Sequence, residues 1–141
     1  MDKELHVRVV TPDRTVFDRK ARAVSFMGLD GSYGILPNHA PLLTATRPGI
    51  VTITHTDGSK EEMLVTDGFA EMRNNVLSLI CEAGERVEEI DVERAKAAEE
   101  RARQRIAEGP ETPDGSLPRA EASLRRAMLR QLVGRRGRSQ N

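Results

Sequence analysis

Four arginines in the last third of the chain stand at spacings suited to binding an anion. Arg94 and Arg101 are seven residues apart, so on an ideal helix they point within about 20° of each other. Arg126 and Arg130 are four apart and also share a helix face. Planar guanidinium groups bind phosphate oxygens bidentately. If the two helices fold together, these residues predict a phosphate site; the alternative is that they are solvated or contact a protein partner.

His39 is the other side chain whose setting suggests chemistry. It stands between Pro37 and Pro41, inside residues 31–44, which we interpret as a rigid surface loop that presents side chains in fixed positions. As a general base it would need an orienting acid and a cleft, and the sequence pattern supplies neither. A packing or partner-binding histidine is therefore the favoured interpretation. The chain has no phosphate-binding Gly-x-x-x-x-Gly-Lys run, so we expect no catalytic residue and no hydrolysis.

Short apolar runs separated by turn residues fill the first part of the chain. Asp-Gly, Pro-Gly and Asn-Asn pairs lie between the runs, and such pairs favour tight turns. This spacing predicts an antiparallel β-sandwich or flattened barrel over residues 1–86. The expected strands are residues 5–10, 23–27, 33–36, 50–54, 63–66, 69–72 and 76–81.

Asp91 marks the change from strands to helices, because its short carboxylate can cap the first turn of a helix over residues 91–108. Small apolar residues recur along that helix at helical spacing: Val92, Ala95, Ala98, Ala102 and Ile106. Glycines and prolines at 109–118 predict a loop. A second helix should follow, ending near Gly134, with one apolar side made of Leu117, Ala120, Leu124, Ala127 and Met128.

The two helices predict an antiparallel hairpin over residues 87–141. Alanine is the best helix former but buries little area, so each helix should persist while the docking between them stays weak. From the residues alone, a permanently docked hairpin and one that opens are both open alternatives. The predicted fold is therefore an N-terminal antiparallel β-sandwich followed by a C-terminal two-helix hairpin.

Charge and composition narrow the class of protein. The 22 basic and 22 acidic residues balance, but residues 115–141 carry seven arginines against the single acidic Glu121. The one cysteine, Cys81, lies in an apolar run, which predicts a buried, inert thiol in a reducing compartment. No segment has the roughly 20 apolar residues that a membrane span needs, and the charged start of the chain is unlike a signal peptide. We expect a soluble, cytoplasmic protein.

The most distinctive run is Gly31-x-x-Gly34-Ile35-Leu36-Pro37-x-His39-Ala40-Pro41-Leu42-Leu43-Thr44, followed by Pro48-Gly49. With Thr66-Asp67-Gly68-Phe69-Ala70-Glu71 and the helices after it, this run resembles the epsilon subunit of bacterial F-type ATP synthases over essentially the whole chain. The resemblance implies a sandwich bound to the gamma subunit and resting on the ring of c subunits. It assigns the ring contact to His39 and to Ser32, which stands where relatives often have an acidic residue.

A second resemblance concerns Ile90-Asp91-x-x-Arg94-Ala95, which is similar to the motif of epsilon subunits that bind ATP. It implies ATP as a regulatory ligand, with no cofactor required. Asp91, Arg94 and Ala95 would lie near the adenine and Glu85 would be an outer contact. The phosphates would lie near Arg101, Arg126 and Arg130.

The resemblance further implies a non-catalytic rotor subunit on the cytoplasmic face of the cell membrane, attached through its partners. Its hairpin would fold with ATP bound and extend into the alpha/beta catalytic head when ATP is scarce. The inhibitory contacts would come from Arg125, Arg126, Arg130, Arg135 and Arg136. Two other hypotheses stand beside it: an adaptor that binds nucleic acid through the arginine-rich helix, and an enzyme that uses His39.

Overall fold

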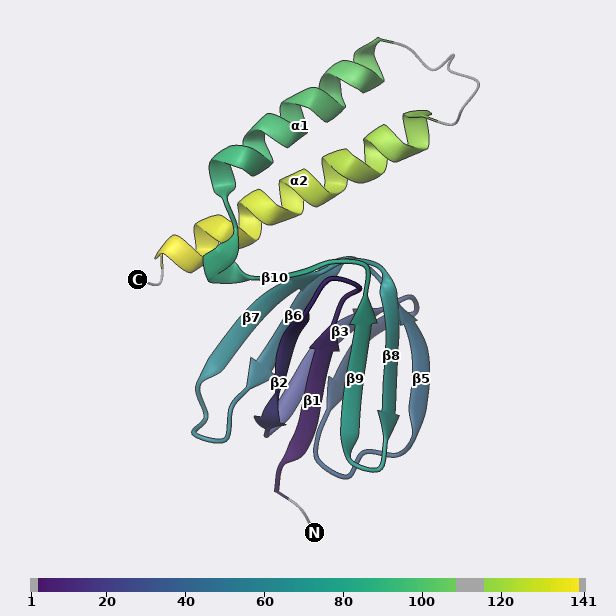
Figure 1. The fold of residues 1–141 in the computed structure, drawn as a ribbon, viewed down its shortest axis with the longest axis vertical. Coiled ribbons are helices and arrows are strands. Elements are labelled where there is room, and N and C mark those ends of the chain that lie inside the picture. The colour runs from purple at the N-terminus through teal and green to yellow at the C-terminus, as the bar shows by residue number, and fades with distance from the viewer. Residues whose placement is uncertain (1–2, 109–115, 140–141) are drawn as a thin grey trace. The chain divides into compact units, whose positions relative to one another are not determined.

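The computed structural model describes residues 3–108 and 116–139, with side chains for all of these except 116–117 and 136–139 (Figure 1). The chain divides into two compact units, Met1–Arg86 and Val87–Asn141. The first unit is built of strands and the second of helices. Together they give the β-sandwich followed by two helices that the sequence predicts.

The strands of the first unit join in one continuous sheet that folds over into two layers (Figure 1). The hydrogen-bonded order is β10-β7-β6-β3-β5-β8-β9-β1-β2, and β4 pairs with β3. Only β1 and β9 run parallel among the described pairs. The strands are β1 (Leu5–Val10), β2 (Thr15–Ala21), β3 (Ala23–Gly28), β4 (Gly31–Ile35), β5 (Leu42–Thr46), β6 (Gly49–Thr54), β7 (Lys60–Val65), β8 (Gly68–Arg73), β9 (Val76–Cys81) and β10 (Gly84–Arg86).

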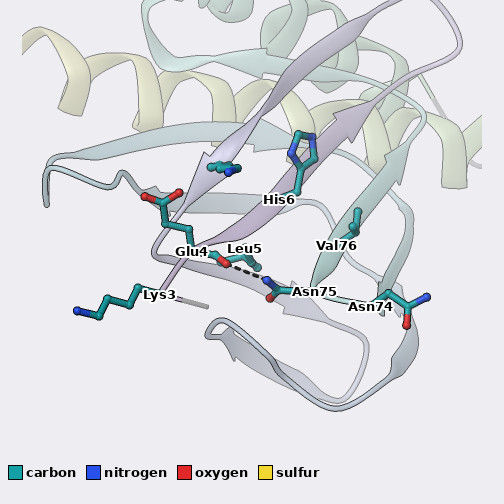
Figure 2. A pocket seen from close by; sticks show the side chains of 8 residues that line it. Lys3, Glu4, Leu5, His6, Asn74, Asn75 and Val76 are labelled. Carbon is teal, nitrogen blue, oxygen red and sulfur yellow. Dashed lines mark hydrogen bonds between the residues drawn. The ribbon is translucent and has the colours of Figure 1, made fainter. Parts of the chain in front are cut away.

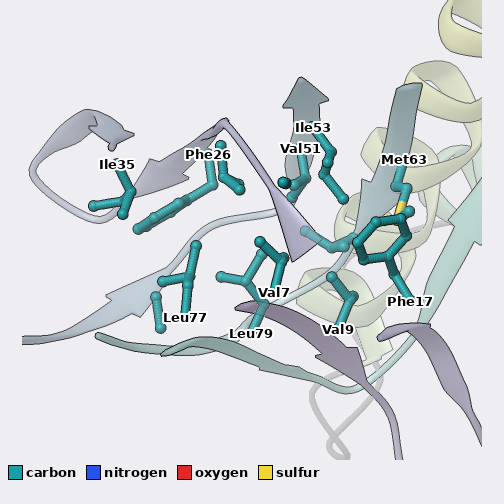
Figure 3. Close-up of a cluster of buried hydrophobic side chains, with 14 of the residues drawn as sticks. Val7, Val9, Phe17, Phe26, Ile35, Val51, Ile53, Met63, Leu77 and Leu79 are labelled. Carbon is teal, nitrogen blue, oxygen red and sulfur yellow. The ribbon is translucent and has the colours of Figure 1, made fainter. Parts of the chain in front are cut away.

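The core lies between the layers, because alternate residues of each strand point inward (Figure 3). Val7 and Val9 on β1 pair in register with Leu77 and Leu79 on β9, and all four are fully buried. Cys81 is also buried in this cluster, as predicted. The core cluster draws only on residues of the first unit.

Two arginines bridge the edges of the sheet, where β10 and β2 end the strand order. The Arg14 guanidinium donates to the carbonyl of Gly84 at 3.0 Å, and that of Arg86 donates to the carbonyl of Val16 at 3.0 Å. Glu61 on β7 lies 3.4 Å from Arg86 and holds it in place. These side chains add hydrogen bonds between the two edge strands, which are not neighbours in the strand order. The last strand before the helical unit is therefore fixed on both sides.

The structure contains three strands that the sequence did not predict: β2, β5 and β10. The interpretation of residues 31–44 as one surface loop is wrong, because β4 and β5 occupy most of it and only residues 36–41 form the loop. The apolar residues Leu42 and Leu43 continue into β5, which pairs with β8 along its whole length. Backbone pairing, which the local pattern does not reveal, decides these positions.

The second unit begins with a short 3-10 helix, η1 (Val87–Glu89), followed by α1 (Val92–Ala107) and α2 (Ser116–Ser139). Asp91 is the N-cap of α1, as predicted: its carboxylate accepts from the backbone N–H of Arg94 at 3.1 Å. The predicted end of the second helix near Gly134 is wrong, since α2 continues to Ser139. Pro118 lies in the first turn of α2, where a missing N–H costs nothing.

The helices pack through small side chains. Val92, Ala95 and Ala102 are buried on α1, and Ala120 and Ala127 on α2. The buried stripe then continues on α2 through Gln131 and Gly134, four and three residues further on. Met128 is 47% exposed, so its assignment to the buried side is wrong: it lies about 100° round the helix from Ala127. The side chain of Leu117 lies outside the described residues.

Candidate functional site

The joint at residues 90–95 is shaped by the cap of α1. Asp91 is exposed, and the residues on either side of it, Ile90 and Val92, are buried. Ala95 is buried one turn later, whereas the side chain of Arg94 is exposed. The motif therefore presents a carboxylate and a guanidinium outward from a rigid first turn.

A polar contact between the helices fixes how their faces align. The amide Nε2 of Gln131 donates to the Glu99 carboxylate, and a side chain at Gly134 would meet Val92. Residues 92 and 99 thus face residues 134 and 131, so the helices run antiparallel. On each helix, the predicted phosphate-binding arginines lie roughly 100–160° round from this polar contact. In an antiparallel pair that places Arg94, Arg101, Arg126 and Arg130 on one flank of the hairpin, which we call the arginine flank.

The arginine flank is largely open to solvent. Arg94, Arg101 and Arg126 are exposed, and Arg130 is half-buried. The Arg126 guanidinium donates to the hydroxyl of Ser123 at 3.2 Å. Within the described part of the chain, the guanidinium groups of Arg94 and Arg101 make no hydrogen bond or ion pair. Their donors are available to an anionic ligand.

The remaining arginines of the predicted inhibitory set point in different directions. Arg125 and Arg135 are exposed and lie off the arginine flank. The Arg135 guanidinium reaches the side-chain oxygen of Gln131 at 3.4 Å. The side chain of Arg136 lies outside the described residues. Glu85, the predicted outer ATP contact, lies on β10 opposite Leu64 in the other unit.

The polar contact also sets the ionisation of Glu99. Hydrogen bonds from Gln131 and Arg103 hold the pKa of the Glu99 carboxyl below its usual value of 4.5. Arg103 donates to the same carboxylate at 2.9 Å. Glu99 is therefore a charged acceptor on α1 that binds Arg103 of the same helix and Gln131 of α2. The sequence did not predict this contact, because Gln131 interrupts the apolar stripe of the second helix.

The structure separates the two predicted ring-contact residues. Ser32 pairs with Met27 next to the β3–β4 turn, whereas His39 follows the opposite end of β4. The His39 Nδ1 donates to the carbonyl of Ala40 at 2.7 Å, and no carboxylate among the described residues accepts from its ring. His39 thus lacks the orienting acid that a catalytic base would need.

Hydrogen bonds hold the loop of residues 36–41, which carries His39, in place. The Asn38 backbone N–H donates to the side chain of Asn75 at 2.8 Å. Asn75 in turn donates to the carbonyl of Glu4 at 2.8 Å (Figure 2). Asn38, Asn74 and Asn75 all have positive φ, which asparagine tolerates. An open hollow of about 400 Å³ lies beside Asn75 (Figure 2). Both charge signs line it, from Lys3, Lys20 and Glu4, so it shows no preference for one ligand charge.

An apolar face on the sandwich is a feature that the sequence prediction missed. Leu43, Phe69 and Ile80 are 71%, 58% and 50% exposed. Phe69 pairs directly with Ile80 on β9 and with Ala45 on β5, two residues from Leu43. The side chains therefore share the outer face of β5, β8 and β9. Contiguous exposed apolar side chains of this kind mark protein contacts.

Residues 3–108 and 116–139 contain neither a membrane-spanning helix nor a cluster of metal-binding side chains. No helix there is long and apolar enough to span a bilayer. No group of three or more His, Cys, Asp or Glu side chains in those residues could hold a metal ion.

Comparison with known families decides among the hypotheses. Residues 4–87 match the beta-sandwich domain of the ATP synthase delta/epsilon chain, and residues 88–130 match its long alpha-helix domain. The chain belongs to the ATP synthase delta/epsilon chain family. This family member is a non-catalytic subunit of the complex. Neither the hypothesis of an enzyme that uses His39 nor that of a nucleic-acid adaptor is needed to explain this family match.

Relatives of this epsilon chain match it along most of its length. The ATP synthase epsilon chain of Nitratidesulfovibrio vulgaris is 38% identical over 133 residues, which cover 94% of this chain and 97% of the relative. That of Moorella thermoacetica is 40% identical over 126 residues, covering 89% and 92%. That of Brevibacillus brevis is 45% identical over 106 residues, covering 74% and 80%.

Solved structures share the fold at lower identity. A chain of the Euglena gracilis mitochondrial ATP synthase, solved as OSCP/F1/c-ring, superposes with a TM-score of 0.67 at 21% identity, covering 92% of this chain and 76% of that one. A chain of the Tetrahymena thermophila mitochondrial ATP synthase central stalk/c-ring gives 0.62 at 13% identity, covering 92% and 97%.

Proposed function

We propose that this epsilon chain is a rotor subunit that couples the gamma subunit to the c-ring and regulates ATP hydrolysis through a mobile hairpin that binds ATP. The observation that carries the proposal is the hairpin itself. Its interface consists mainly of small side chains, with Val92 and Gln131 among them, and one flank presents four arginines. A weakly docked pair with a cationic flank is suited to being closed by a polyanionic ligand.

The ATP site of this proposal uses the joint and the arginine flank together. Asp91 and the Arg94–Ala95 turn lie near the adenine, and Arg101, Arg126 and Arg130 lie near the phosphates, with Glu85 as an outer contact. The arginines come from both helices, so a phosphate chain that binds them all bridges α1 and α2. A ligand shifts a conformational equilibrium only by its differential affinity for the two states. ATP that needs both helices therefore stabilises the closed hairpin.

When ATP is scarce, the hairpin opens and α2 extends into the alpha/beta catalytic head. Arg125, Arg126, Arg130, Arg135 and Arg136 then meet acidic loops there and block rotation in the hydrolysis direction. Arg126 and Arg130 belong to both sets, so ATP and the catalytic head compete for them. This competition is what makes the hairpin a sensor.

The sandwich is the part that stays attached to the rotor. We assign its apolar face, Leu43, Phe69 and Ile80, to the gamma subunit, because that face offers large exposed apolar side chains. Ser32 and His39 are assigned to the ring of c subunits. Since they lie at opposite ends of β4, one ring surface reaches both only if β4 lies along it. Through these partners the chain is held at the cytoplasmic face of the membrane.

Calorimetric titration of the isolated chain with ATP tests the nucleotide site. We expect binding heat at millimolar ATP in the wild type. Arg126→Ala should weaken binding about tenfold, because it removes a charge-assisted contact to phosphate. Arg125→Ala is the matched control, since Arg125 is adjacent but off the arginine flank, and it should change affinity little. Absence of heat from the wild type would refute the ATP site and leave the rotor assignment intact.

A further inference from the structure

Gly134 is the point of closest approach between α2 and the joint. It is buried inside α2, five residues before the helix ends. A Cβ atom at this position would lie 2.7 Å from Cγ2 of Val92 and 3.1 Å from Cγ2 of Ile90. Contacts below 3.0 Å require a neighbour to move. The closed hairpin therefore has no room for a side chain here.

The neighbours of Gly134 are poorly able to move. Val92 and Ile90 are 2% and 6% exposed, so other atoms surround them. Both are β-branched, so two heavy atoms on Cβ restrict rotation about χ1. A methyl group at 134 would thus be relieved by separation of the helices rather than by a rotamer change.

We propose that Gly134 is a positioning residue for the nucleotide site, since the lack of a side chain lets α2 close against the two residues that flank Asp91. Glycine is a poor helix former, so local helix propensity does not explain its presence in α2. Its position brings the α2 backbone onto the joint. The role in ATP binding rests on the proposed function, whereas the role in closure rests on packing alone.

If Gly134 has this role, Gly134→Ala should open the hairpin and Val92→Ala should offset that opening. Gly134→Ala introduces one methyl group into a full contact and should lower the ratio of closed to open hairpin about tenfold, a typical effect of overpacking. Val92→Ala removes the atom that the new methyl group would strike. The double variant Val92→Ala/Gly134→Ala should restore much of the closed population.

The test is pulsed electron paramagnetic resonance on the full chain with spin labels at Lys96→Cys and Leu132→Cys, both exposed positions, in a Cys81→Ala background. Without ATP, Gly134→Ala should move population from the short interhelical distance to longer ones while the helical circular dichroism does not fall. The double variant should recover the short distance. Saturating ATP should return Gly134→Ala toward the closed state, with an apparent affinity reduced in proportion to its closed fraction.

Two results would overturn the inference: an unchanged distance distribution in Gly134→Ala, or an opened hairpin that Val92→Ala does not rescue at all. Failure of ATP to shift any distribution would instead count against the proposed nucleotide site, because closure is measured in its absence. The two failures are therefore distinguishable.

Discussion

Glu99 and Gln131 show how single residues set the strength of the hairpin. Gln131 is only 7% exposed, yet it lies in a stripe of alanines, and its amide is satisfied by the Glu99 carboxylate and by the carbonyl of Ala127. An interface of alanines buries little apolar area. One satisfied polar contact therefore contributes a larger share of the stabilisation here than it would in a leucine-rich core. It also fixes the register between the helices.

The lowered pKa of Glu99 makes hairpin closure depend on pH. A carboxyl whose pKa is lower in the folded state contributes stability above its usual pKa, 4.5, and loses it as the pH falls through the folded value. The closed fraction, measured with the same spin labels, should therefore be larger in wild type than in Glu99→Gln at pH 7. As the pH falls through the folded pKa of Glu99, the difference should shrink and then vanish.

Glu99→Gln is a stringent comparison because it keeps the size and an acceptor for Gln131 while removing the titrating charge. A difference that stays constant as the pH is lowered until the Glu99 carboxyl is protonated would show that the charge of Glu99 has no part in closure.

Among single residues, the sequence predicted those whose role depends on neighbours in the chain. The cap at Asp91 and the burial of Cys81 are both confirmed, because each depends on neighbours in the chain. Burial also raises the pKa of Cys81 to about 11, which fits an inert thiol. The burial of Gln131 could not be predicted, since it depends on Glu99 in the other helix.

Among the elements, the sequence predicted the helices and most inner strands, but it missed the inner strand β5 and both edge strands, β2 and β10. Seven strands were expected from apolar runs, and each expected segment overlaps an observed strand. The missed strand β2 carries Asp18, Arg19 and Lys20 in a row, which reads as a polar loop. The missed strand β10 has three residues, and two contacts with residues far along the chain fix it: Arg14 donates to the carbonyl of Gly84, and Arg86 of β10 donates to the carbonyl of Val16. Edge strands bury less, so their apolar signal is weak.

The outer face of β5, β8 and β9 gives a prediction about the sheet as a binding surface. Phe69→Ser should weaken binding to the gamma subunit by about 2 kcal/mol, or roughly 30-fold, because an aromatic side chain loses its burial in the interface. The melting temperature should not fall appreciably, since Phe69 is already 58% exposed. Binding of the purified subunits can be followed by surface plasmon resonance.

Arg73→Ser on the same strand is the matched control. Its side chain is 73% exposed and its ion pair with Glu71 spans 4.0 Å, so this pair contributes little. If both variants bound gamma like wild type, the apolar face would have to be assigned to another partner.

In the whole molecule, two units divide the tasks. The sandwich has its own core between two layers. Under the proposed function, it remains bound to the rotor while a ligand shifts the closure of the hairpin, whose interface is built largely of small side chains. The family could be inferred from a run of residues around His39, but the packing of Gly134 on the joint could not, because it needs the register between two helices.

Removing the hairpin is the most direct test of whether it inhibits ATP hydrolysis. A chain truncated after Ile90 keeps the whole sandwich, so it should still assemble with gamma and the c-ring. ATP hydrolysis by the reconstituted complex should then rise above that of the complex with the full chain, most clearly at low ATP. Unchanged hydrolysis at every ATP concentration, with assembly verified by co-purification, would contradict the account.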